Sequence, residues 1–511
     1  MSTYDNSVPY PSFVFDHIRP EHIGAVAALH GIRRNDVSDC CVLELGCGDG
    51  ANLLSIAYAM PASRCVGVDL SAQRISEAKA VAARIGVKNA TFCNMDVMDF
   101  TPEEFGKFDF IIAHGLYSWI PEEVRERVLS IYRTCLKPDG VGYISYNAYP
   151  GWHMRNVLRD AMRFHSGNIT DPTEKMDASL NFLQFLCETS RAGSVYRSYL
   201  EEERDSMSKR YKAALLHDDL NELNQPFYFR DFVESISKHR LRFVAEAEPV
   251  AFFDNPLPQF ARDLLEQLWD DPVRREQYLD FIRCTRFRST LVCHEVAEPS
   301  YRPLVGAIDA LFLSTRSEPK SESPVFSDES EVIFTGPRDT EFSTNHPFTK
   351  MALHILGSRR PESSSFESLS ERLRNCFPAL SQSEMDAETA QLKTYMLELI
   401  HSSIVEARCF VPEFSKAVSQ HPKMSAFARW QAETGFDYVT SVTGKSLAIK
   451  NQLVRAMISL LDGSRDRSKL VADLLHQVSV QPTQQKTFEA NLPEMVDDNL
   501  NIFVKSAMLI A

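Results

Sequence analysis

The stretch CCVLELGCGDGANLL, residues 40–54, joins a short apolar run to one acid, three alternate glycines and the opening of a second apolar segment. The run Cys41–Leu45 predicts a buried strand, and residues 51–60 predict a helix after the glycine turn. A backbone that turns this tightly lets a ligand approach the main chain, where a side chain would collide. Two classes of cofactor use that geometry, so this stretch alone does not choose between them.

The segments that follow alternate between strand-like and helix-like patterns. Strands are predicted over 64–68, 90–93, 108–113 and 141–146, and helices over 71–85, 101–104 and from residue 121. Strands that alternate with helices at this spacing are typical of a doubly wound parallel sheet. The sequence therefore predicts an α/β, Rossmann-like fold for the first part of the chain.

The positions of acidic residues distinguish the two cofactor classes. Dinucleotide-binding folds and S-adenosylmethionine methyltransferases both place glycines after the first strand and an acid after the second. Here Glu44 precedes the glycines in an E-x-G-x-G-x-G pattern, which is the methyltransferase form. Asp69 follows the second strand, where it can bind the ribose hydroxyls, and Asp96 follows the third, where it can bind the adenine amino group. We therefore expect a class I methyltransferase that uses S-adenosyl-L-methionine, with a nicotinamide enzyme as the alternative. The expected cofactor-binding residues are Glu44, Gly46, Cys47, Gly48, Gly50, Asp69, Leu70, Asp96 and Val97.

The loop after the fourth strand is rich in aromatic residues. It runs AHGLYSWIP over 113–121 and lacks the Asn/Asp-Pro-Pro-aromatic pattern of many amide, adenine and glutamine methyltransferases. In this fold the loop lies beside the reactive methyl group, so His114, Tyr117 and Trp119 are the candidate catalytic residues. A lysine acceptor has a reference pKa of ~10.4 and must react unprotonated, which a dry aromatic channel favours. The alternative is that these rings only pack beneath a lid.

The composition limits the classes of protein and partner. A chain of 511 residues is too long for one core, and a net charge of −14 argues against a nucleic-acid partner. The first residues, MSTYDNSVPYPSF, carry no signal-peptide pattern, and no run approaches the ~18 apolar residues of a membrane span. We therefore expect a cytoplasmic protein with no membrane partner. The eleven cysteines form no CxxC pair and no His/Cys cluster, which predicts reduced thiols and no metal site.

Several motifs outside the glycine turn are specific to one family. They are YDNSVPYPS (4–12), HGLYSWIP (114–121), YNAYPGW (146–152), NQPFYFRDF (224–232) and EQYLDFIRCTRFRSTL (276–291). Together they resemble the rickettsial outer-membrane-protein lysine methyltransferases and their broader bacterial relatives, which carry a methyltransferase regulatory domain. The likeness extends over most of the chain.

The resemblance implies a bacterial protein-lysine N-methyltransferase that uses S-adenosylmethionine, is usually dimeric, and carries added middle and C-terminal domains. It implies a protein substrate, an outer-membrane or surface protein among the candidates. By this likeness the matching positions contact the cofactor at Gly46, Gly48, Asp69 and Asp96. By the same likeness the reaction centre includes His114, Tyr117 and Trp119.

The rest of the chain predicts further domains. We expect the methyltransferase domain over 1–165, an inserted helical lid or dimerisation segment over 166–225, and a return to the sheet over 226–255. A middle or regulatory domain is expected over 256–330, with a helical pattern over 256–313 and a Ser/Pro/acid linker over 314–330. Winged-helix-like domains are expected over 331–511.

The insert and the C-terminal part each leave alternatives open. One helix of the insert is apolar on two faces, which suits a lid that also forms a homodimer, or ordinary packing on its own domain. Helix–turn–helix patterns over 347–373 and 449–475 resemble winged helices, but neither second helix carries the basic run of a DNA reader. We therefore expect these two helix–turn–helix segments to recognise a protein or to have a structural role.

The pattern as a whole favours a methyltransferase that modifies lysine side chains of a protein. Two alternatives stay open, a methyltransferase of small molecules and a cofactor-binding regulatory protein with little catalysis. The intact turn from Glu44 to Gly50 argues against a regulatory protein with little catalysis. The large C-terminal part argues against a methyltransferase of small molecules, because a small acceptor needs no docking surface.

Overall fold

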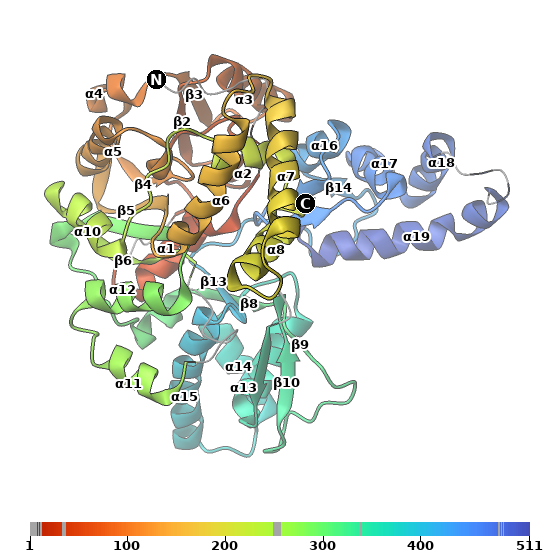
Figure 1. Ribbon diagram of the computed structural model, residues 1–511. Coiled ribbons are helices and arrows are strands. Elements are labelled where there is room, and N and C mark those ends of the chain that lie inside the picture. Colours follow the sequence, from red (N-terminus) through yellow and green to blue (C-terminus); the bar gives the residue numbers. More distant parts are fainter. Residues whose placement is uncertain are drawn as a thin grey trace.

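The glycine turn connects an inner strand of a seven-stranded sheet to a helix on one of its faces. The computed structural model describes residues 8, 10, 13–32, 37–248, 257–337, 340–478, 481, 483 and 485–510 (Figure 1). The strands of this sheet are β1 (Cys41–Leu45), β2 (Arg64–Asp69), β3 (Ala90–Asn94), β4 (Phe108–Ala113), β5 (Leu136–Asn147), β6 (Leu241–Glu246) and β7 (Phe287–His294). They lie in the order β3-β2-β1-β4-β5-β7-β6. The first five are parallel, and β7 is antiparallel to both β5 and β6. The predicted Rossmann-like sheet is confirmed.

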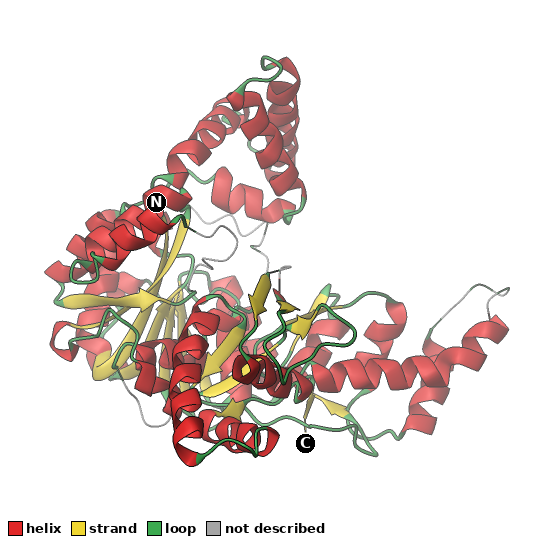
Figure 2. Cartoon of the chain, turned by 90° about the horizontal axis from the view of Figure 1, so that it is seen from below, coloured by secondary structure: helices red, strands yellow, loops and turns green. Residues whose placement is uncertain are grey.

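Helices cover both faces of the sheet (Figure 2). One layer holds α1 (Pro20–Leu29), α2 (Ala51–Ala59) and α3 (Ala72–Ile85), and the other holds α4 (Pro102–Phe105), α5 (Glu122–Cys135) and α10 (Phe229–Lys238). Successive strand side chains point to opposite faces, so Val42 packs in the first core and Leu43 in the second. Burial on both faces explains why the strand sequences are continuously apolar.

The expectation of helix across 256–313 is wrong over its second half. Residues 259–283 do hold α11 (Gln259–Glu266) and α12 (Pro272–Arg283), but β7 then enters the main sheet between β5 and β6. Arg288 in this strand is buried, and its guanidinium binds three carboxylates, those of Glu246, Glu276 and Asp280. The segment expected to be a separate helical domain therefore completes the sheet.

The inserted segment is helical, as predicted, and begins earlier than expected. Its elements are α6 (Gly151–Ser166), α7 (Pro172–Thr189), α8 (Val195–Ser208), α9 (Lys212–Ala214) and a π-helical turn at Leu215–Asp219. In Figure 1, α7 and α8 lie in front of the sheet, in yellow. The insert has its own core, and the buried Arg155 joins Glu203 of α8 to Asp219 of the π-helical turn.

The C-terminal half contains two helix–turn–helix units, as the sequence predicts. The first is α13 (Pro347–Ser358) and α14 (Phe366–Cys376), followed by α15 (Gln382–His401). It packs with a sheet of β12 (Ser364–Ser365), β8 (Phe312–Thr315) and β13 (Val405–Arg408). The expected linker over 314–330 is only partly a loop, because β8 ends inside it. It also contains β9 (Glu318–Pro319), which pairs with β10 (Val332–Thr335) beside β11 (Glu341–Thr344).

The second unit is α17 (Gln452–Leu460) and α18 (Arg467–Gln477), between α16 (Ala426–Glu433) and α19 (Gln485–Lys505). Short strands accompany it, namely β14 (Lys423–Met424) with β17 (Leu509–Ile510) and β15 (Tyr438–Thr440) with β16 (Ser446–Ala448). These helices extend to the right in Figure 1. Across the residues that the structure describes, no helix is both long and apolar enough to cross a bilayer.

Candidate active site

The glycine turn has the left-handed backbone that its glycines permit. Gly46, Gly48 and Gly50 have φ angles of 71°, 54° and 75°. A Cβ at Gly48 would meet no atom within 4 Å, whereas one at Gly50 would lie 2.5 Å from the Phe92 ring. Gly50 thus allows the turn to pack on β3, and Gly48 presents bare backbone to open space. A ligand can approach the main chain at Gly48.

Glu44, at the end of β1, is buried with an unused acceptor. Its Oε1 accepts a 3.4 Å hydrogen bond from Asn52 Nδ2, while the buried Oε2 has no hydrogen-bond partner. Burial, opposed by the Asn52 bond, raises the pKa of Glu44 to about 8. A buried carboxylate oxygen without a hydrogen bond is costly, and a ligand ammonium would compensate it. The amino group of a methionine moiety fits this position.

Asp69, at the end of β2, shapes the glycine turn. Its Oδ2 accepts from the Gly48 N–H and its Oδ1 from the Ser71 N–H, both at 2.8 Å. Burial raises the pKa of Asp69, and the two backbone donors oppose that rise. Each carboxylate oxygen has a second lone pair, so Asp69 can bind two ribose hydroxyls while it holds the turn.

The loops after β2 and β3 present apolar side chains beside Asp96. Leu70 is 68% exposed, Met98 is also exposed, and Val97 is partly buried. Asp96 Oδ1 accepts a 3.0 Å hydrogen bond from the Met98 N–H, which fixes the start of a 3-10 turn at Val97–Asp99. A flat aromatic base can lie against such side chains while a neighbouring carboxylate accepts from its amino group. The adenine site that the sequence predicts at Leu70, Asp96 and Val97 stays a prediction.

Cys47 lies within the turn and is buried. Burial, reinforced by the nearby carboxylates of Glu44 and Asp69, raises the pKa of its thiol, so the thiolate needed of a nucleophile is disfavoured. Its main-chain N–H donates to Val68 O at 3.1 Å. Cys47 therefore contributes to the turn through its main-chain hydrogen bond and through a side chain small enough to be buried there.

His114, directly after β4, lies in a buried polar cluster that sequence analysis missed. Its Nδ1 is 3.0 Å from the Tyr143 hydroxyl, which in turn donates to Ser289 Oγ at 3.0 Å. Burial, with a smaller contribution from His17, lowers the pKa of His114 to about 3, so the imidazole is neutral at physiological pH. A neutral ring does not repel a cationic acceptor. Tyr143 and His17 stand in unremarkable sequence, and only the fold brings them to His114.

Tyr117 and Trp119 lie on the other side of the same loop, apart from His114. Tyr117 is 2% exposed and packs on the rings of Tyr146, Phe227 and Phe232 in the core. Burial, partly offset by Arg125, raises its pKa. Trp119 makes an edge contact with Trp152, with ring centroids 6.2 Å apart. The structure thus joins Asp69 to the glycine turn, and it packs His114 on different rings from those that Tyr117 and Trp119 contact.

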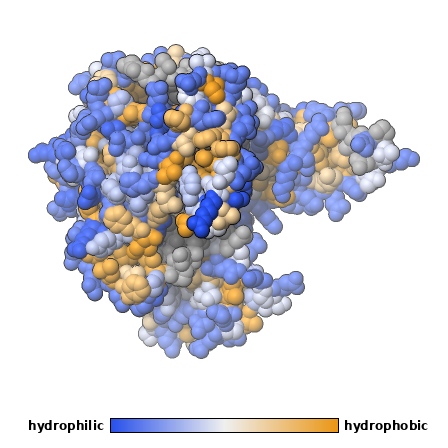
Figure 3. Space-filling view, in the orientation of Figure 1, coloured by the Kyte–Doolittle hydropathy of each residue, from blue (hydrophilic) through white to orange (hydrophobic). Residues whose placement is uncertain are grey.

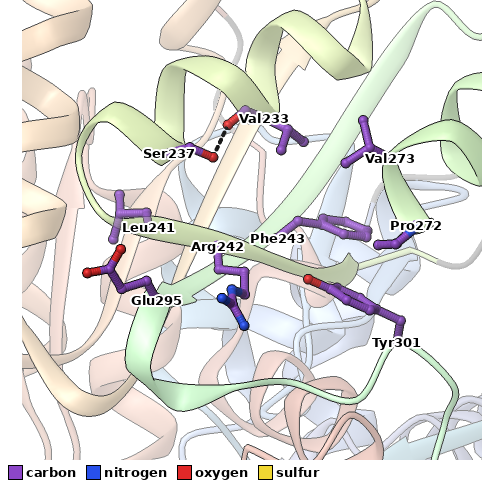
Figure 4. Close-up of a pocket in the computed structure, with 9 residues that line it drawn as sticks. All are labelled: Val233, Ser237, Leu241, Arg242, Phe243, Pro272, Val273, Glu295 and Tyr301. Carbon is purple, nitrogen blue, oxygen red and sulfur yellow. Dashed lines mark hydrogen bonds between the residues drawn. The ribbon is translucent and has the colours of Figure 1, made fainter. Parts of the chain in front are cut away.

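A surface cavity lies elsewhere, at the free edge of the sheet. It has a volume of about 220 Å³, and Figure 4 shows Arg242 and Phe243 of β6, Ser237 of α10 and Tyr301 around it. The cofactor turn is not among its walls. Within the described ranges, His, Cys, Asp and Glu side chains form no group of three or more that could hold a metal ion.

Three family profiles match successive parts of the chain. A methyltransferase domain matches residues 42–140, and a predicted methyltransferase regulatory domain matches residues 211–294. The C-terminal winged helix domain of PKMT matches residues 420–508. The first match covers the whole glycine turn and the acids after β2 and β3, and the third covers the second helix–turn–helix unit.

Similar proteins occur in Rickettsia prowazekii. Protein RP789 is 29% identical over 485 residues, which is 93% of this chain and 86% of the relative. Protein RP028 is 35% identical over 237 residues, which is 46% of this chain and 94% of the relative.

The solved structure of PKMT2 from Rickettsia typhi superposes with a TM-score of 0.85 at 25% identity and covers 98% of this chain and 100% of its own. The same protein has been solved in complex with AdoHcy, with the same score and coverage. The methyltransferase prediction is therefore confirmed over the nicotinamide alternative, and so is the predicted winged helix. The chain belongs to the rickettsial PKMT2-like protein lysine methyltransferase family, with methyltransferase, regulatory and C-terminal winged helix domains, and it is an S-adenosylmethionine-dependent methyltransferase.

Proposed function

We propose that this enzyme N-methylates lysine side chains of a protein substrate. The observation that carries the proposal is the match to PKMT2 through every domain, including the parts that a small acceptor would not need. The neutral His114 beside the loop after β4 also suits an acceptor that arrives as a cation.

In the proposed site the chain's own residues hold the methyl donor at three points. Glu44 Oε2 binds the ammonium of the methionine moiety, Asp69 binds the ribose hydroxyls, and Asp96 binds the adenine amino group. Gly48 leaves bare backbone for the ligand, while Gly46 and Gly50 let the turn pack on the side chains of Leu116 and Phe92. Leu70 and Val97 flank the base, and Cys47 completes the turn.

When bound, S-adenosylmethionine supplies an electrophilic methyl group on a sulfonium. The lysine amine attacks the methyl carbon with its lone pair, the carbon–sulfur bond breaks, and its electrons stay on sulfur. The amine must lose one proton before attack, and the methylated product carries the positive charge. Such a displacement needs alignment and exclusion of water from the amine. His114 faces the acceptor in this scheme, and Tyr117 and Trp119 fix the loop that aligns it.

We also propose a homodimer formed through the inserted helices. Of the two apolar stripes of α7, the one with Met176, Leu183 and Cys187 is buried in the insert. The other leaves Phe185 54% exposed, 5.9 Å from the ring of Phe182. A second copy would cover this stripe.

The test of function uses the full chain with isotopically labelled methyl donor and a bacterial cell-envelope extract. Label recovered on lysine side chains, mapped by mass spectrometry, supports the proposal. Label found only in small molecules would favour the small-molecule alternative, and tight cofactor binding without any transfer would favour a regulatory protein.

A further inference from the structure

Five aromatic side chains from four separate parts of the chain gather beside the cofactor turn. They are Phe13 and Phe15 near the start, His114 after β4, Tyr211 in the insert and Tyr438 of β15, and we call them the aromatic wall. Ring centroids are 4.3 Å apart between Phe15 and His114, and 5.4 Å apart between Phe13 and Tyr211. Phe13 also stacks on Tyr438 at 6.2 Å with an interplanar angle of 16°.

The aromatic wall is linked through Asn52 of α2 to Glu44 beside the cofactor turn. The Phe15 N–H donates a 2.9 Å hydrogen bond to Asn52 Oδ1, and the same amide group donates to Glu44 through Nδ2. At the other end of the wall, burial raises the pKa of Tyr438, and the carboxylate of Asp49 in the glycine turn raises it further. The wall therefore lies next to the turn that holds the methionine end of the cofactor.

Side-chain exposure distinguishes the aromatic wall from the other aromatic candidates. Tyr211 is 47% exposed, and the other four wall residues are partly buried. Tyr117 is almost wholly enclosed by core rings. An acceptor arriving from solvent can contact the wall without displacing the core, whereas reaching Tyr117 would require core side chains to move.

Ion pairs and hydrogen bonds fix the C-terminal part against the N-terminal segment that carries two of the wall residues. Lys445 Nζ binds Asp16 Oδ2 and also lies 2.9 Å from Glu406 Oε1. The buried Arg19 donates to the main-chain oxygen of Val442 at 3.1 Å. These contacts fix the β15–β16 hairpin, which carries Tyr438, against the N-terminal segment. A rigid binding surface requires such support.

We propose that Phe13, Phe15, His114, Tyr211 and Tyr438 form the surface along which the acceptor side chain reaches the methyl donor. This inference rests on the proposed lysine acceptor for its chemistry, but the location of the surface does not depend on it. The insert and the C-terminal part are then components of the acceptor site, in addition to any role in docking a protein.

The aromatic wall suits a lysine side chain in two respects. Its ring faces match the apolar four-carbon stem and attract the cationic head before the proton is lost. Contact with the rings also removes water from the amine, which disfavours its charged form and exposes the lone pair. Neutral His114 adds a polar contact without a like charge.

The location is tested with an analogue of the methyl donor in which a diazirine-bearing alkyl group replaces the sulfonium methyl. After irradiation of the full chain, mass spectrometry identifies the labelled residues. We expect label on wall residues, foremost Phe15 and His114. Label confined to Tyr117, Trp119 or Trp152 would overturn the proposal, whichever acceptor the enzyme uses.

The role is tested by kinetics with lysine-containing peptides and by calorimetry with S-adenosylhomocysteine. We expect Phe13→Ala and Tyr211→Ala to lower kcat/KM for peptides by about tenfold or more while the affinity for S-adenosylhomocysteine stays within about twofold. Tyr211→Phe, which keeps the ring, should recover most of the activity. Tyr196→Ala is the matched control, because Tyr196 is exposed on α8 of the same insert and lies outside the wall.

The two proposals fail differently. Wild-type protein that methylates lysine while the wall variants keep its kcat/KM would overturn the aromatic wall and leave the proposed function intact. Wild-type protein that methylates only small molecules, with diazirine label on the wall, would refute the lysine acceptor and retain the wall as the acceptor surface.

Discussion

The guanidinium of Arg19 donates a 3.1 Å hydrogen bond to the main-chain oxygen of Val442, 423 residues further along the chain. Arg19 also donates to Ser55 Oγ at 2.8 Å and pairs with Glu21 at 2.6 Å. Glu21 in turn accepts from Arg408 at 3.2 Å. These residues are buried, so the junction between the methyltransferase sheet and the C-terminal part is built around enclosed charges.

Arg19→Ala should destabilise the protein by about 3 kcal/mol, because removing one partner leaves a buried carboxylate poorly compensated. Chemical denaturation should show the loss in the transition that separates the C-terminal part from the sheet. Arg84→Ala is the control, since Arg84 pairs with Glu433 at 2.5 Å across the same junction but is 53% exposed. That variant should lose less than about 1 kcal/mol. Equal losses of unfolding free energy in Arg19→Ala and Arg84→Ala would show that burial of the Arg19 ion pair does not determine its contribution to stability.

Glu44→Gln should stabilise the free protein at alkaline pH. The pKa of Glu44 is raised by burial to about 8 from an ordinary value of 4.5. Between those values the native protein holds a proton that the unfolded chain releases, so the stability contributed by this group falls as the pH rises. Glutamine cannot ionise, so the melting temperature of the variant should exceed that of the wild type above about pH 8 and approach it in acid.

The same substitution should weaken S-adenosylmethionine binding, because a neutral amide cannot compensate the ammonium of the methionine moiety. Calorimetry from about pH 6 to about pH 8 should show wild-type affinity rising with pH as Glu44 ionises, and the variant should lack the part of that rise that Glu44 contributes. Identical pH profiles would remove Glu44 from the cofactor site.

Asp69→Ala should weaken S-adenosylmethionine binding by about 2 kcal/mol or more, through lost ribose contacts and an unpaired Gly48 N–H. Calorimetry on the folded variant measures this directly. Asp99→Ala, an exposed carboxylate in the neighbouring loop, should bind normally. Unchanged affinity in Asp69→Ala would show that the ribose lies elsewhere.

Tyr117→Phe should change turnover little, because its hydroxyl lies in the core beside Ser235 rather than at the acceptor. Trp119→Ala should lower turnover by about tenfold or more at nearly constant cofactor affinity, through loss of its contact with Trp152 and loosening of the loop. Steady-state kinetics with a peptide substrate measures the turnover of both variants. A large loss in Tyr117→Phe would mean that the hydroxyl takes part in the reaction.

Phe185→Asp should convert a dimer into a monomer, because a charge in an apolar contact loses its hydration without gaining a partner. Sedimentation or light scattering at several concentrations measures the shift. Gln184→Glu adds the same charge at an exposed polar position of α7 that lies about 100° around the helix from Phe185, and it should leave the dimer intact. A wild-type chain that stays monomeric at every concentration would refute the proposed interface.

The sheet was predictable where the sequence pattern and the burial agree. Residues 41–113 form four parallel strands separated by helices, and β1, β2 and β4 among them are largely buried. The four predicted strands lie within one residue of their observed ends. The strand β5 was predicted as well, but it starts earlier, at Leu136.

The strand β7 could not be recognised in the same way. Arg288 interrupts its apolar run, and the compensating carboxylates come from β6 and α12. Because those partners are set by tertiary structure, a window of sequence gives no sign that the arginine is buried.

The cofactor loops were predictable, because their chemistry is confined to short segments at the ends of strands. The proposed acceptor surface could not be predicted, because its rings lie in four segments that share no local pattern. Phe13 and Tyr438 come together only when the C-terminal part packs on the N-terminal segment, so neither can be identified from its own sequence window. The aromatic residues of the loop after β4 gave a stronger signal in the sequence, yet Tyr117 proved to be a core residue.

The contact between Arg19 and Val442 also affects how the enzyme is made. Arg19 leaves the ribosome 423 residues ahead of Val442, whose main-chain oxygen it binds. A nascent chain can pair β1 to β5 as they emerge, but it cannot yet enclose Arg19 and Glu21. The junction therefore closes only after residue 442 has left the ribosome, and a chain that stalls before that residue should display exposed charges and apolar surface that mark it for degradation.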